Sequence, residues 1–161
     1  MNKVILSLFF LFESHYSMSQ KFFFRPVKYL VFDSLKGKDL MHQCGSRNIP
    51  QNISGYWNLN YPDIELIEKN FKKIRKLRSD QCCNKGYRIL NLKKYGFQYV
   101  GLIIDNKKYI YLNAFPESEF VATPVIVCDG GVLYWGVLFD IYNLNFSQLA
   151  FNGPPISVKD D

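Results

Sequence analysis

The sequence has few of the residue patterns on which common catalytic sites depend. Its 161 residues include only two histidines, His15 and His42. It contains no G-x-S-x-G segment and no glycine-rich phosphate loop, which excludes the sequence signatures of serine hydrolases and nucleotide-binding enzymes. Its four cysteines form no C-x-x-C pair, so the spacing typical of a structural zinc site is also missing. We therefore expect no cofactor and no metal.

The hydrophobic run at the N-terminus is too short to span a membrane. It extends over nine residues, Val4 to Phe12, whereas a transmembrane helix needs about 20. Lys3 precedes the run, and the small residues Ser17 and Ser19 follow it. This pattern is typical of a secretory signal peptide, here residues 1–19. We therefore expect a periplasmic or secreted protein that begins at Gln20; the alternative is a buried N-terminal strand of an intracellular protein.

Charges of the two signs are unevenly distributed along the chain. The sequence has 20 basic and 14 acidic residues, a formal net charge of +6. Residues 20–94 contain 16 basic and 6 acidic residues, whereas residues 95–161 contain 3 and 7. The basic part could contact an anionic surface, although a solvated helix face explains such charges more often. We expect no nucleic-acid partner.

The four cysteines, Cys44, Cys82, Cys83 and Cys128, all follow the predicted signal peptide. An even number of cysteines in an oxidising compartment favours one or two disulfide bonds. Cys82 and Cys83 are adjacent and would pair with each other only under strain. We therefore expect bridges that tie this pair to Cys44, to Cys128 or to both. The alternatives are a metal site formed by His42 with Cys44, Cys82 and Cys83, and a Cys44 nucleophile beside His42.

The remaining chain has the length of one domain. We divide the sequence into a signal peptide (1–19), an N-terminal strand and loop extension (20–54), an α+β domain (55–153) and a C-terminal tail (154–161). Within the extension, the aromatic residues from position 21 to 35 predict one strand. Residues 36–59 are rich in glycine, asparagine, serine and glutamine, which predicts a long loop.

One helix is predicted between Asp63 and Arg78. Pro62 suits the first turn of a helix, where no backbone donor is needed. Apolar side chains recur at spacings of three and four, which predicts one buried stripe: Ile64, Ile67, Phe71, Ile74 and Leu77. Basic residues fill the C-terminal half, so the helix could lie on a membrane surface. The same stripe, however, is needed to cover a sheet.

From residue 87 onward the sequence predicts strands. Six short segments are rich in tyrosine, isoleucine, valine and phenylalanine. They are Tyr87–Leu92, Phe97–Ile104, Tyr109–Phe115, Pro124–Cys128, Leu133–Phe139 and Asn145–Phe151. The short connections between them join antiparallel neighbours. The predicted fold class is therefore α+β, with one main helix packed on a mostly antiparallel meander sheet of about six strands.

Three segments of the domain share a recognisable pattern. They are Tyr95 to Gly101, with Gln98-Tyr99-Val100-Gly101; Tyr109 to Phe115; and Cys128-Asp129-Gly130-Gly131 followed by Trp135-Gly136. With Gly55-Tyr56-Trp57 before them, they resemble an uncharacterised family of small exported bacterial single-domain proteins. The resemblance covers residues 55–153. It implies export and a single α+β domain, and it transfers no catalytic residue.

Aromatic and polar side chains of the predicted sheet are the candidate binding residues. Tyr109, Tyr111 and Asn113 share one face of their strand, and Tyr99 belongs to the strand before it. If these faces point the same way, the sheet carries an aromatic platform of the kind that stacks sugars or peptides. The alternative is that the aromatic residues fill the core. The candidate set is Tyr99, Tyr111, Asn113, Asp129, Tyr134 and Trp135.

Asp129-Gly130-Gly131 has two interpretations. The glycines favour a tight hairpin turn, which Asp129 would cap. Alternatively, the Asp129 carboxylate lies at an open strand end, within reach of a substrate. A glycosidase-like site would need two carboxylates close together in space, and the spacing of residues in the sequence does not establish this. The candidate carboxylates are Asp105, Glu117, Glu119, Asp129 and Asp140.

The sequence therefore favours an extracytoplasmic, non-catalytic binding or interaction module whose partner is a protein, glycan or peptide. One alternative is a small hydrolase-like enzyme that uses Asp129 and nearby tyrosines. The other is an envelope-associated structural protein held by its basic helix.

Overall fold

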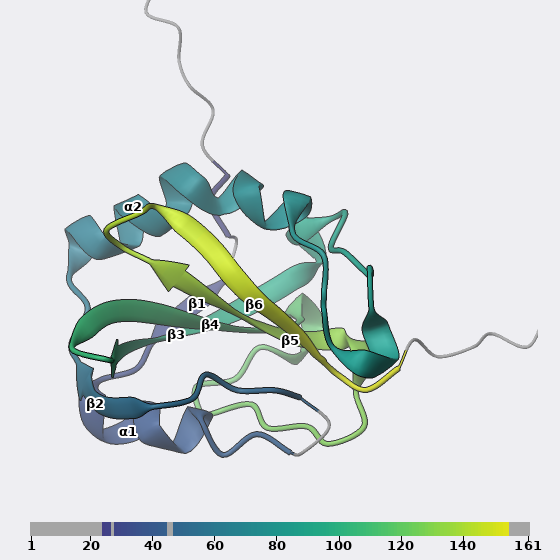
Figure 1. Cartoon of the computed structure of the whole chain (residues 1–161), viewed down its shortest axis with the longest axis horizontal. Coiled ribbons are helices and arrows are strands. Elements are labelled where there is room, and N and C mark those ends of the chain that lie inside the picture. Colours follow the sequence, from purple (N-terminus) through teal and green to yellow (C-terminus); the bar gives the residue numbers. More distant parts are fainter. Residues whose placement is uncertain (1–23, 27, 45–46, 155–161) are drawn as a thin grey trace, which may run out of the picture.

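The computed structural model describes residues 24–26, 28–44 and 47–154. These residues form a six-stranded sheet with one α-helix on each face (Figure 1). The strands are β1 (Tyr29–Val31), β2 (Ile53–Trp57), β3 (Tyr95–Ile104), β4 (Lys107–Pro116), β5 (Gly131–Asp140) and β6 (Asn145–Asn152). The helices are α1 (Ser34–Leu40) and α2 (Tyr61–Asn70), and the short 3₁₀ helices are η1 (Phe71–Lys76), η2 (Cys82–Asn84), η3 (Leu92–Lys94) and η4 (Glu117–Glu119).

The sheet is mixed. Its strand order is β1-β3-β4-β5-β6, and β2 also pairs with β3. β1 runs parallel to β3, whereas β2 runs antiparallel to it farther along the same edge. The α+β class and the six strands are confirmed, but the predicted antiparallel meander is wrong for this edge. Two strands from the N-terminal part of the chain complete the sheet there.

Four of the six predicted strands are confirmed as β3, β4, β5 and β6. The predicted strands Tyr87–Leu92 and Pro124–Cys128 are wrong. The backbone N–H of Tyr87 donates to the carbonyl of Asn84, and its carbonyl accepts from Ser79, so Tyr87 belongs to a turn. Pro124 has no backbone donor, and the backbone around it bonds to side chains of the sheet instead of to a strand.

The predicted helix is divided into α2 and η1. It begins at Tyr61, where Asn60 and Asp63 form a capping box. A continuous helix to Arg78 is wrong, because the α-helix ends at Asn70 and a tighter 3₁₀ helix follows. The Asn70 side chain donates to the Leu66 carbonyl at 2.8 Å, a local bond of the kind that competes with helix continuation. The apolar stripe from Ile64 to Ile74 is nevertheless buried as predicted.

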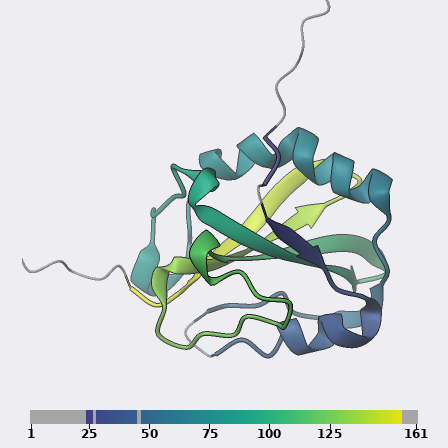
Figure 2. The same cartoon turned by 180° about the vertical axis from the view of Figure 1, so that it is seen from behind.

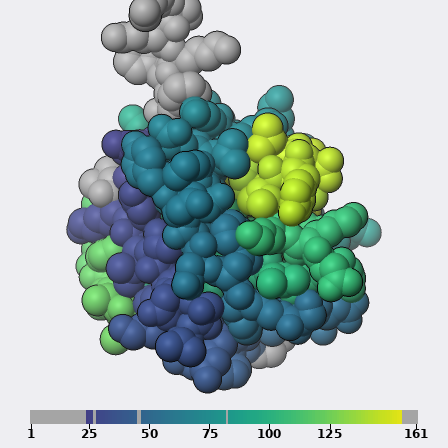
Figure 3. Space-filling view, turned by 90° about the vertical axis from the view of Figure 1, so that its left-hand side faces the viewer, coloured from purple at the N-terminus to yellow at the C-terminus, as the bar shows by residue number. Residues whose placement is uncertain are grey.

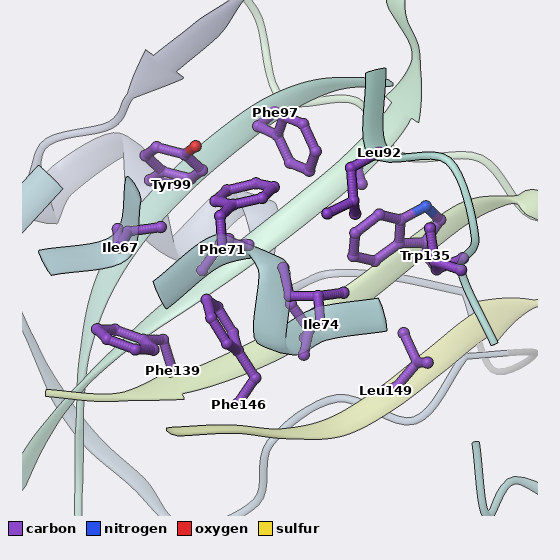
Figure 4. Packing of buried hydrophobic residues seen from close by; sticks show 14 of the residues in the cluster. Ile67, Phe71, Ile74, Leu92, Phe97, Tyr99, Trp135, Phe139, Phe146 and Leu149 are labelled. Atoms are coloured by element: carbon purple, nitrogen blue, oxygen red, sulfur yellow. The ribbon is translucent and has the colours of Figure 1, made fainter. Parts of the chain in front are cut away.

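The larger of the two cores lies between this stripe and the sheet. Figure 4 shows Phe71 at its centre, among aromatic side chains of β3, β5 and β6. The Phe71 ring stacks on Phe24 with 4.9 Å between centroids and meets Phe97 edge to face, also at 4.9 Å. Burying aromatic rings of this size makes a large contribution to the stability of a small domain.

The second core lies on the opposite face and includes α1. Leu40 and Met41 pack there with Phe32, Val100 and Leu102. The predicted loop 36–59 is therefore wrong, since it contains most of α1 and the whole of β2. Asp33 caps α1 by accepting from the backbone N–H groups of residues 35 and 36. The segment predicted as an N-terminal extension thus contributes β1, α1 and part of β2 to the fold.

Candidate functional site

The tyrosines of the predicted aromatic platform lie on opposite faces of the sheet. Tyr99 belongs to the core under α2 and Tyr111 to the core under α1. Both are at most 1% exposed, and Trp135 is fully buried. Burial raises the pKa of both tyrosines. These three residues therefore fill the core, as the alternative interpretation stated, and cannot form one exposed surface.

Asp129 and Tyr134 lie near the start of β5 without bonding to each other. Asp129 is exposed at a bend, and residues 117–130 connect β4 to β5, so the predicted tight hairpin is wrong. Tyr134 donates a hydrogen bond to the Glu119 carboxylate. Burial and this carboxylate raise the pKa of Tyr134 to about 12. Tyr134 is thus paired with Glu119 rather than with Asp129.

Asn113 is at the centre of a buried polar network. Its Nδ2 donates to Oε1 of Gln98 at 3.2 Å and to the Val125 carbonyl at 3.0 Å. Oε1 of Gln98 accepts from the backbone N–H of Val125 at 2.9 Å, and Nε2 of Gln98 donates to the Thr123 carbonyl at 2.6 Å. Two side-chain amides of the sheet therefore hold loop 117–130 in the way that a neighbouring strand would.

A disulfide bond joins Cys44 to Cys128 on the same face. The prediction that a bridge ties the Cys82–Cys83 pair to one of these cysteines is wrong, because Cys44 and Cys128 are bonded to each other. The bond also removes Cys44 as a nucleophile or as a metal ligand beside His42. Figure 2 shows the two linked segments: the chain after α1, and loop 117–130 in green. Within the part of the chain that the structure describes, no group of three or more His, Cys, Asp or Glu residues could hold a metal ion.

Sequence reasoning missed Arg47, the charged member of the network. Its side chain is 3% exposed, and its Nη2 donates to Oδ1 of Asn113 at 2.7 Å. Burial lowers the pKa of the guanidinium, although arginine stays protonated in proteins. Arg47 was missed because its segment has the polar composition of an exposed loop. No local pattern marks a buried arginine there.

A groove lies at the end of the sheet that carries the β3–β4 and β5–β6 turns. Figure 3 shows these turns one above the other, with the β5–β6 turn in yellow and the β3–β4 turn in green. Two depressions of about 640 Å³ and about 580 Å³ adjoin here, since they share Ile104, Asp105, Ser147 and Gln148 in their linings. We call these two depressions together the groove.

The groove is acidic and rich in side-chain amides, in a chain whose net charge is positive. Its lining includes three aspartates, Asp80, Asp105 and Asp140, together with asparagine and glutamine residues from two segments, 48–52 and 143–148. Neither lysine nor arginine is among the described residues that line it. The charged side chains of the lining are therefore all negative, and the cation that acts on Asp140 is Lys107, which lowers the pKa of this aspartate from outside the lining.

The aspartates of the groove differ in their surroundings. Asp140 accepts three hydrogen bonds within the β5–β6 turn, from the backbone N–H groups of Tyr142 and Asn143 and from Nδ2 of Asn143. Burial alone would raise the pKa of Asp140, but these bonds, together with the positive charge of Lys107, outweigh it and lower the pKa below its usual value. Asp105 and Asn48 are exposed, and their side chains make no hydrogen bond to other described residues. These two side chains can therefore bond to a ligand without breaking a bond of the protein.

The apolar stripe of the basic helix is used in the core. This stripe, from Ile64 to Ile74, packs on the sheet, and Lys73 donates from Nζ to the carbonyl of Leu144 at 2.7 Å. Among the described residues, no helix is both long and apolar enough to cross a membrane.

Comparisons with family models, with curated proteins and with solved structures found no match to this chain. The chemistry of the groove is therefore the basis of the proposal that follows.

Proposed function

We propose that this chain is an extracytoplasmic, non-catalytic module that binds a glycan in the groove. The observation that carries the proposal is a continuous depression lined by carboxylates and amides, with no cationic side chain among the described lining residues. Concave sites with a few convergent polar groups are the usual places for small ligands.

Carboxylates and amides suit the hydroxyl groups of sugars. A hydroxyl group both donates and accepts hydrogen bonds, and an asparagine or glutamine side chain does the same through its carbonyl oxygen and NH₂ group. A carboxylate such as that of Asp105 accepts from hydroxyl groups more strongly than a neutral oxygen. Tyr109 is half-buried in the same groove, where its ring offers an apolar surface to a sugar ring.

The hydrolase alternative has less support from the same geometry. The groove brings together Asp105 and Asp140, two of the carboxylates considered for a glycosidase-like pair. A glycosidase needs one carboxylic acid with a raised pKa as its proton donor, whereas the pKa of Asp140 is lowered. Asp129 lines none of the three depressions described for this chain, the two of the groove and a smaller one of about 340 Å³. A binding role therefore fits these residues better than catalysis.

The extracytoplasmic part of the proposal has support of a different kind. The Cys44–Cys128 bond is typical of oxidising compartments, where disulfides form and persist. The predicted signal peptide, residues 1–19, lies outside the described residues. The resemblance to an exported family agrees with the same location.

The experiment is a glycan-array screen of the oxidised protein, followed by titration of the best oligosaccharide. The test variant combines Asn48→Ala with Asp105→Asn, two exposed groove side chains whose loss breaks no described hydrogen bond. A neutral hydrogen bond contributes about 0.5–1.5 kcal/mol and one to a charged group about 1.5–3 kcal/mol. We therefore expect the double variant to weaken glycan binding at least tenfold.

Asp129→Asn is the matched control, because it removes another exposed carboxylate outside the groove. It should leave glycan affinity unchanged. Glycan affinity should also vary little between low and high salt, since hydroxyl groups carry no charge. Equal affinities of the groove variant and the wild type would contradict the proposal. So would binding only to cationic peptides with a steep salt dependence, which would identify the groove as a peptide site.

A further inference from the structure

Arg47 carries a positive charge into the interior, and no described residue forms an ion pair with it. The ion pairs formed by the described residues join Arg25 to Glu68, Lys28 to Glu117 and Lys69 to Glu65, and none includes Arg47. A buried charge is strongly destabilising unless it is paired and its hydrogen-bonding groups are used. This site therefore lacks a negative partner from the described part of the chain.

Three buried donors at this site have no hydrogen-bond partner among the described residues. Within the described part of the chain, Nε and Nη1 of Arg47 make no hydrogen bond, and neither does the hydroxyl group of Tyr111. Burial is the main cause of the pKa shifts of Arg47 and Tyr111. In each case the second cause is the electrostatic interaction between these two residues. The geometry agrees: the Tyr111 hydroxyl lies directly over Gly136, the cross-strand partner of Asn113, and Arg47 bonds to Asn113. A guanidinium and a phenol O–H that converge in a water-poor interior are the donors that an anion requires.

We infer that a small inorganic monoanion such as chloride binds to the Arg47 guanidinium and the Tyr111 hydroxyl beneath loop 117–130. The anion is small because Arg47 is 3% exposed and Tyr111 1% exposed, which leaves no room for a ligand that extends to the surface. It is monovalent because one guanidinium supplies one charge. The site is independent of the groove, since neither residue belongs to the groove's lining.

The anion would stabilise the fold at the point where the chain after α1 meets loop 117–130. Arg47 bonds to Asn113, which in turn holds the Val125 carbonyl of that loop. A ligand that binds only the folded state shifts the folding equilibrium towards that state. Once the ligand concentration is well above the dissociation constant, the equilibrium constant for folding rises in proportion to the ligand concentration.

The experiment measures urea unfolding at constant ionic strength while chloride replaces gluconate, an anion too large for the site. In the wild type, the equilibrium constant for folding should rise by up to tenfold for each tenfold increase of chloride above its dissociation constant. Arg47→Met should lose this dependence. Arg88→Met, which replaces an exposed arginine, should keep it and so serves as the matched control.

A water molecule is the competing occupant, and it would also suit the unpartnered Oε1 of Gln43. Water predicts the same unfolding midpoint in chloride and in gluconate, and that result would overturn the inference. Equal chloride dependence in the wild type and in Arg47→Met would do the same. If Arg47→Met does not fold, crystals of the wild type soaked in bromide decide the matter. An anomalous peak beside the Arg47 guanidinium is expected, and its absence refutes the site.

Discussion

Replacing both Cys44 and Cys128 with alanine should lower the free energy of unfolding substantially. The bond joins residues separated by 84 positions. In the chain-entropy model, closing a loop of that length in the unfolded state stabilises the folded state by about 4.5 kcal/mol at 25 °C. Domains of this size are stable by only about 5–15 kcal/mol. The bond therefore supplies a large part of the total stability.

Urea denaturation followed by tryptophan fluorescence measures this effect, since Trp135 is fully buried in the folded state. With a slope of about 2 kcal/mol per molar urea, the midpoint should fall by about 2 M. The wild type under reducing conditions should unfold at nearly the midpoint of the double variant. Adding reductant to the double variant should then change nothing further.

The location of the bond adds a second expectation. Gln98 and Asn113 still hold loop 117–130 when the bond is absent. Amide exchange in that loop should therefore increase no more than expected from the loss of global stability. A loss below about 1 kcal/mol would refute the entropic reasoning. A large increase of exchange confined to the loop would show that the bond, rather than the buried amides, holds the loop in place.

Two further predictions concern the buried network and export. Gln98→Leu removes the hydrogen-bond partners that the Thr123 carbonyl and the Val125 N–H have on the sheet. At about 1–3 kcal/mol for each group left unpaired, urea denaturation should show a loss of about 2–6 kcal/mol. A loss below about 1 kcal/mol would contradict the network. If residues 1–19 are a signal peptide, the intact mass of the exported protein should correspond to a chain that begins at Gln20. A mass that still includes Met1 would rule out the predicted cleavage.

Local patterns in the sequence determined much of the sheet. β3 and β4 were predicted because the turn-forming residues 105–108 separate two segments rich in strand-forming residues, although the observed turn is shorter and consists of Asp105 and Asn106 alone. Both residues have a positive φ, 47° and 62°, as a two-residue hairpin turn requires. The helical stripe from Ile64 to Ile74 was predicted for the same kind of reason. In each case the side chains that decide the structure lie within a few residues of one another.

The candidate site depended on contacts that no local pattern contains. The pairing of β1 with β3, the Cys44–Cys128 bond and the bond from Arg47 to Asn113 each join residues more than 60 positions apart. Asn113 was selected from the sequence, but as part of an exposed platform rather than of a buried network. The reason is that residue spacing shows which side chains share a face of one strand, whereas packing decides which face is covered.

The sequence by itself determined the α+β class, four of the strands, the amphipathic stripe and the possibility of a disulfide bond. Periodicity and turn chemistry act over a few residues, so they can be read from the sequence directly. The tertiary structure alone decided that Tyr99 and Tyr111 are core residues, which cysteines pair, and that four distant segments form an acidic groove. These features follow from how the segments pack around two cores, and packing is a property of the whole chain.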